Sequence, residues 1–108
     1  MSTAIEFQNI TKTYENKTMN YINKIANKIS ERDDMVALFA LINNDKLNLL
    51  FACSKNLEQL DMNNLLKDSI KLVDGKGGGS KVLAQGGGKN NGNLDSLFDY
   101  VKMKLKSN

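Results

Sequence analysis

The chain has 108 residues, the length of one compact domain with a single core, so we expect residues 1–108 to form one domain. It contains no histidine and one cysteine, Cys53, which excludes histidine-based catalytic machinery, internal disulfides and cysteine-cluster metal sites. The net charge of +3 favours an anionic partner, and the absence of a long apolar run or a signal-peptide pattern predicts a cytoplasmic chain with no membrane partner.

The first half of the chain is expected to contain three strands and one helix. Residues 4–10 alternate loosely between apolar and polar, as a half-buried strand does, and the apolar residues of 15–30 recur at helical spacing. Residues 35–42 are apolar throughout, which is typical of a strand covered on both faces. The turn residues 43–45 and a second apolar run over 47–53 then predict a hairpin that ends at a buried Cys53.

The second half is expected to contain two helices around a glycine-rich loop. Asp61 is a suitable N-cap for the first helix, and Gly75 is expected to end it. The glycine-rich stretch 75–92 is interrupted by a short edge strand over 81–85, and a last helix follows Asn93. The predicted fold class is therefore α/β: a single compact domain with a mixed central β-sheet flanked by helices, in the order β-α-β-β-α-β-α, with the Gly-rich loop before the last strand.

The glycines predict the binding chemistry. All eight lie between Gly75 and Gly92, and glycine leaves backbone N–H groups unshielded, so that successive groups can form a concave nest for an anionic oxygen. Lysines between the glycines would add positive charge for a phosphate of a nucleic-acid backbone. A plain surface loop, with lysines that reflect only composition, would account for the same residues. The candidate RNA- or phosphate-binding residues are Lys76, Gly77, Gly78, Gly79, Ser80, Lys81, Gln85, Gly86, Gly87, Gly88 and Lys89.

Neither of two well-known phosphate motifs fits this stretch. Gly88-Lys89 is followed by Asn90 rather than by the Ser or Thr of a P-loop, and Gly75-Lys76-Gly77 lacks the third glycine of a dinucleotide fingerprint. We therefore expect no nucleotide hydrolysis, and the sequence identifies no catalytic residue, no metal site and no cofactor. The tyrosines at 14, 21 and 100 are scattered along the sequence, so no base-stacking platform is expected.

The paired glycine motifs Gly75-Lys76-Gly77-Gly78-Gly79 and Ala84-Gln85-Gly86-Gly87-Gly88-Lys89, followed by a helix at Leu94-Asp95-Ser96-Leu97, are similar to those of the DHH-associated domain. That domain forms the C-terminal part of alanyl-tRNA synthetases and of longer free-standing alanyl-tRNA editing proteins, and it accompanies the catalytic domain of DHH phosphoesterases. The resemblance implies a non-catalytic tRNA-binding domain whose glycine-rich loops and lysines hold the tRNA backbone. The implied partners are tRNA, specifically tRNA-Ala, and other domains of the parent enzyme.

Two questions stay open at this stage. Ser80 stands where phosphoesterase members often have histidine and synthetases commonly have Arg-Pro. The alternative function, a substrate-phosphate-binding accessory lobe of a DHH-type phosphoesterase, therefore loses its most useful side chain, while a synthetase and an editing protein remain equal candidates for the parent. The apolar stripe of the last helix predicts either a homodimer or ordinary packing in the core of the domain.

Overall fold

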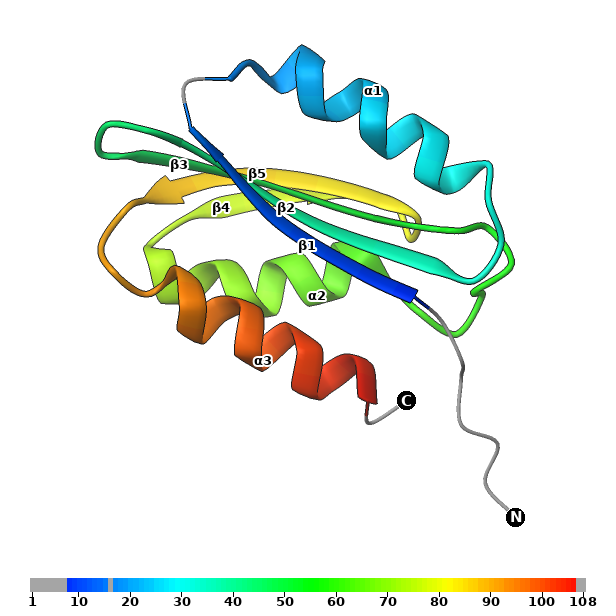
Figure 1. Cartoon of the computed structure of the whole chain (residues 1–108). Coiled ribbons are helices and arrows are strands. Elements are labelled where there is room, and N and C mark those ends of the chain that lie inside the picture. The colour runs from blue at the N-terminus through cyan, green and yellow to red at the C-terminus, as the bar shows by residue number, and fades with distance from the viewer. Residues whose placement is uncertain (1–7, 16, 107–108) are drawn as a thin grey trace.

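Five strands form one mixed sheet in the order β1-β2-β3-β5-β4, as the computed structural model shows for residues 8–15 and 17–106. Helix α1 lies on one face of the sheet, and α2 and α3 lie on the other (Figure 1). The predicted α/β class is confirmed. The elements are β1 (Gln8–Glu15), α1 (Met19–Ser30), β2 (Met35–Asn43), β3 (Lys46–Cys53), α2 (Met62–Ser69), the short 3-10 helix η1 (Ile70–Val73), β4 (Lys76–Gly79), β5 (Leu83–Lys89) and α3 (Leu94–Lys106).

The first three elements form a crossover unit in which β1 runs parallel to β2. The described part of the first strand extends to Glu15, five residues beyond the predicted end, and α1 begins at Met19 rather than near residue 15. The sequence did not predict this extension, because the run Thr11-Lys12-Thr13 is polar. Such a run is compatible with β1, since β1 is an edge strand whose outer residues stay exposed. The predicted residues 4–7 lie outside the described part of the chain.

The central hairpin supplies most of the core. β2 and β3 pair antiparallel from Val36↔Cys53 to Asn43↔Lys46, as predicted, and Asn44 takes the left-handed conformation that the two-residue turn requires (φ 57). Alternate residues pack in opposite directions, so that Phe39 belongs to the core beneath α1 and Phe51 to the core above α2 and α3. Cys53 is fully buried as expected, and this burial raises the pKa of its thiol to about 11.

Ser54, directly after β3, connects the end of α1 to the start of β2. Its buried hydroxyl accepts a hydrogen bond from Met35 N at 2.9 Å and donates to Ile29 O at 3.4 Å. Its own backbone N–H donates to Met35 O at 2.8 Å. The Ser54 side chain therefore forms hydrogen bonds with buried backbone groups of both α1 and β2, which water cannot reach.

The helix in the middle of the chain begins as predicted and ends differently. Asp61 is its N-cap, and its carboxylate accepts a hydrogen bond from Asn64 N at 3.1 Å. The chain reverses at Asp74, which adopts the left-handed conformation (φ 52), and not at the predicted Gly75. An aspartate tolerates this conformation because its short polar side chain bonds locally. Gly75 is required for another reason, since a Cβ atom there would collide with the carbonyl oxygen of Gly87.

The glycine-rich stretch forms two strands, where we predicted a loop with one short edge strand over 81–85; the strand that forms there, β5, lies inside the sheet between β3 and β4. β4 and β5 pair antiparallel, with Gly77 opposite Gly86 and Gly79 opposite Ala84, which adds one strand to the predicted order. The backbones approach so closely that a Cβ at Gly77 would lie 2.5 Å from both Gln85 O and Gly86 Cα. A Cβ at Gly86 would lie 2.6 Å from Ile70 Cδ1, which packs from η1. These glycines therefore pair because they lack side chains.

The last helix, α3, packs on α2 and η1. Its apolar stripe of Leu97, Phe98, Val101 and Leu105 is buried in the core of its own domain. The structure therefore supports the second alternative, packing in the core of the domain, and this stripe gives no support for a homodimer. No helix within residues 8–15 and 17–106 is long and apolar enough to span a membrane.

Replacing the buried hydroxyl of Ser54 should destabilise the domain. Ser54→Ala leaves the N–H of Met35 buried without its partner, so we expect the free energy of unfolding in urea to fall by about 1–3 kcal/mol. The exposed Ser96 on α3 is the matched control, and Ser96→Ala should change this free energy by less than about 0.5 kcal/mol. Equal unfolding midpoints for the two variants would contradict the role of Ser54.

Two adjacent glycines should respond differently to the same substitution. Gly86→Ala forces a methyl group against Ile70 Cδ1 and against Lys76 O at 2.7 Å, so we expect a loss of about 1–3 kcal/mol in unfolding free energy. At Gly87 the nearest atom to an added Cβ is Asn48 Oδ1 at 3.3 Å, and Gly87→Ala should fold with nearly unchanged stability. Chemical denaturation of both variants measures the difference, and identical stabilities would refute the close-approach explanation.

Candidate nucleic-acid interface

The amides of the glycine segment are largely engaged inside the protein. Gly75 N donates to Ile70 O at 3.0 Å, Gly79 N to Asn63 Oδ1 at 2.9 Å and Ser80 N to Leu83 O at 2.8 Å. Other amides of the segment belong to the ladder between β4 and β5. The predicted nest of free N–H groups is therefore not formed. Any role of the glycines in binding must come from the bare surface that they leave exposed.

The three lysines of the glycine segment do not lie together. Lys76 and Lys89 lie toward one end of the β4–β5 pair, because Lys76 is opposite Gly87. Lys81 lies in the turn at the other end, roughly 20 Å away along β5. Its Nζ donates to Glu58 O at 3.0 Å, and the Ser80 hydroxyl is likewise held by Leu83 N and Leu83 O. Lys81 and Ser80 are thus occupied within the protein.

A lysine that the sequence did not single out completes the group at the first end. Lys46, the first residue of β3, lies directly opposite Lys89 across the sheet. We call Lys46, Lys76 and Lys89 the lysine cluster. All three residues are exposed, and within the described part of the chain none of them has a hydrogen bond or ion pair through its side chain. The predicted strand began at Leu47, one residue after Lys46, and no local signal predicted that β5 would be its neighbour.

The lysine cluster places like charges close together on neighbouring strands. Like charges directly opposite each other on neighbouring strands destabilise a sheet, and Lys46 and Lys89 are such a pair. Asp45, in the adjoining turn, and Asp74, before β4, lie near this end in the chain and reduce the local excess of charge. A bound polyanion would remove the repulsion between the lysines and gain charge-assisted hydrogen bonds from them.

Gln85 and Gly86 lie beside the lysine cluster, at a shallow groove on the α1 side of the sheet. The groove has a volume of about 340 Å³ and is also lined by Met19, Asn23 and Asn48. The sequence predicted Gln85 and Gly86 as binding residues but gave no signal for Met19 and Asn48. Met19 and Asn23 are one helical turn apart on α1, and Asn48 lies opposite Gly87 in the register of the sheet.

The tyrosines are not all scattered in space. Tyr14 and Tyr21 make an edge-to-face contact with ring centroids 5.5 Å apart, and the ammonium of Lys17 lies 5.2 Å from the ring of Tyr21. Tyr14 also makes an edge-to-face contact with Phe39, with ring centroids 6.0 Å apart. β1 extends far enough to bring Tyr14 beside the first turn of α1, so two of the three tyrosines contact each other although they are separated in the sequence. Tyr14 packs against the core beneath α1, whereas the Tyr21 side chain is 44% exposed.

Comparison with known proteins agrees with this architecture. The family model of the DHHA1 domain matches residues 7–107. The chain is 38% identical over 84 residues to an alanine–tRNA ligase of Methylacidiphilum infernorum, which covers 77% of this chain and 9% of the ligase. It is 36% identical over 105 residues to an alanine–tRNA ligase of Caldicellulosiruptor saccharolyticus, which covers 94% of this chain and 12% of the ligase. The chain thus spans about a tenth of the length of these relatives.

A solved structure has the same fold. The C-Ala domain from Aquifex aeolicus alanyl-tRNA synthetase superposes with a TM-score of 0.87 at 22% sequence identity, covering 99% of this chain and 97% of that domain. The resemblance inferred from the glycine motifs is therefore confirmed, and this chain belongs to the DHHA1 domain family.

Proposed function

We propose that this chain is a tRNA-binding domain of an alanine–tRNA ligase and contacts the sugar-phosphate backbone of tRNA-Ala. The ligases that it resembles and the shared fold with a C-Ala domain support this assignment. Its size supports a binding role, because the chain corresponds to about a tenth of such a ligase and the ligation chemistry would belong to other domains. Those domains, together with tRNA, are its proposed partners. Among the possible parents, the relatives favour a ligase over an editing protein or a phosphoesterase.

The lysine cluster is the observation that carries the proposed contact with RNA. Lys46, Lys76 and Lys89 are exposed, lack partners within the described part of the chain and are held on three adjacent strands. A rigid sheet keeps these cations at fixed spacing, which suits the regular charges of a nucleic-acid backbone. Phosphate contacts of this kind position an RNA without reading its sequence.

The glycines contribute to the proposed contact because they have no side chains that would keep an RNA away from the strands. Gly77, Gly79 and Gly87 are exposed, and at these positions no side chain extends from the strand pair that carries Lys76 and Lys89. An RNA backbone can therefore approach the strands closely enough for the lysine side chains to reach its phosphates. In this proposal Gly86 and Gly88 allow the strand pair to pack closely, Gly78 lies against α2, and Ser80 and Lys81 support the turn.

Removing the lysine cluster should weaken tRNA binding and its dependence on salt. In the triple variant Lys46→Ala, Lys76→Ala and Lys89→Ala, we expect the slope of log affinity against log salt to fall by about two to three phosphate contacts. Fluorescence anisotropy of labelled tRNA-Ala at several salt concentrations measures this slope.

The control must change the net charge equally. Replacing Lys102, Lys104 and Lys106 of α3 by alanine also removes three positive charges, but from the side of the sheet that faces away from α1 (Figure 1). This variant should retain nearly the full salt slope. If both triple variants lose the same slope, the binding reflects overall charge, and the lysine cluster is not the contact surface.

A further inference from the structure

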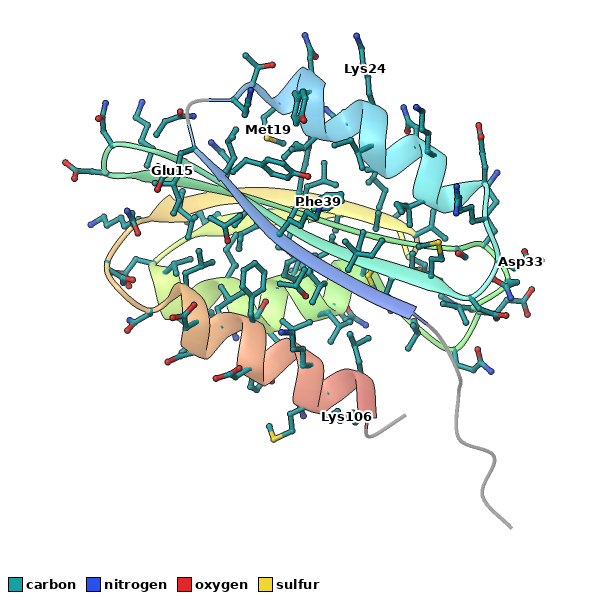
Figure 2. All side chains as sticks on the ribbon, viewed as in Figure 1. Glu15, Met19, Lys24, Asp33, Phe39 and Lys106 are labelled. Atoms are coloured by element: carbon teal, nitrogen blue, oxygen red, sulfur yellow. The ribbon has the colours of Figure 1, made fainter. Side chains whose placement is uncertain are left out.

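The groove on the α1 side of the sheet brings together three amide side chains from separate elements. Asn23 comes from α1, Asn48 from β3 and Gln85 from β5, and together with Met19 and Gly86 they line about 340 Å³. Figure 2 shows Met19 extending from the first turn of α1 toward the sheet. Because α1 packs mainly on β2 and β3, the outer face of β5 remains exposed beside it.

The three amides are available to a ligand. None of Asn23, Asn48 and Gln85 has a side-chain hydrogen bond within the described part of the chain. Each amide offers two N–H donors and a carbonyl acceptor, so the groove presents both kinds of group along its edge. The lining contains no cation, which makes the groove a poor site for a phosphate itself.

The lining of the groove suits a flat ring. Its floor on the sheet includes Gly86, which has no side chain. Its lining on α1 includes Met19, and methionine sulfur makes favourable contacts with aromatic rings. A planar heterocycle with donors and acceptors on its edge would stack against the floor and exchange hydrogen bonds with the amides. Nucleobases have this combination, and asparagine and glutamine pair with base edges in two-point contacts.

The lysine cluster lies next to the groove. Lys46 is two residues from Asn48 on β3, and Lys89 is two residues from Gly87 on β5, so both lysines point to the same face as the amides. A nucleotide with its base in the groove would therefore have its phosphates close to two exposed cations. This charge arrangement favours RNA over an extended peptide as the occupant.

We propose that the groove binds one unstacked nucleobase of the tRNA, recognised by Asn23, Asn48 and Gln85. This inference rests on the proposed tRNA-binding function and adds to it a contact that reads a base. The two surfaces have separate roles. The lysine cluster supplies affinity that depends on salt, and the groove supplies hydrogen bonds and stacking that do not.

The test separates the groove from the lysine cluster. The double variant Asn48→Ala and Gln85→Ala should bind a tRNA-Ala transcript about tenfold more weakly with an unchanged salt slope. The matched control, Asn20→Ala and Gln59→Ala, removes the same two residue types from exposed positions outside the groove and should bind as the wild type does. Circular dichroism and unfolding midpoints verify that both variants are folded.

A second measurement uses the wild-type chain. In ¹⁵N-edited NMR spectra, the side-chain amide signals of Asn23, Asn48 and Gln85 should shift when the transcript is added, and those of Asn20 and Gln59 should not. Binding of the double variant within twofold of the wild type, or stationary groove signals while Lys46 and Lys89 backbone signals shift, would overturn the groove and leave the proposed function intact. If the wild type binds no transcript at low salt, the proposed function fails, and the groove as an RNA site fails with it.

Discussion

The approach of β4 to β5 is the contact on which the rest of this surface depends. A Cβ atom at Gly77 would lie 2.5 Å from two backbone atoms of β5, so only glycine allows the pair to form. The same absence of side chains lets Ile70 and Val73 of η1 pack against Gly86 and Gly88. The sheet thereby gains a fifth strand that carries almost no side chains of its own. Its stability comes from the close packing of its neighbours, since glycine itself costs backbone entropy on folding.

This arrangement leaves part of one sheet face uncovered. α2 packs against β4 and β5 on one side, while α1 on the other side packs mainly on β2 and β3. Gln85, Gly87 and Lys89 are consequently exposed beside α1. A face of this kind is unusual in a sheet otherwise buried on both sides, and it bears two features that stability alone does not require. One is the pair of opposed lysines, and the other is the set of amides without internal partners.

A division of labour follows for the proposed function. Cations on a rigid sheet attract and orient a polyanion at long range, but their energy is screened by salt and carries no sequence information. Amides in a neutral groove act only at contact distance and distinguish what they touch. With a formal net charge of only +3, the chain has little nonspecific attraction for RNA, so that the placement of three lysines matters more than their total.

The sequence by itself determined the features that depend on neighbours along the chain. The hairpin of residues 35–53, the N-cap at Asp61, the amphipathic helices and the family of the domain all follow from local periodicity, turn chemistry and the two glycine motifs. Tertiary structure alone decided which strands became neighbours outside this hairpin. Register between distant segments placed Lys46 opposite Lys89, separated Lys81 from both, and turned a presumed loop into paired strands. The glycine-rich stretch is especially hard to assign from sequence, because glycine has no side chain and therefore shows no alternation of apolar and polar residues. Whether such a stretch forms a strand or a loop depends on the strand that pairs with it.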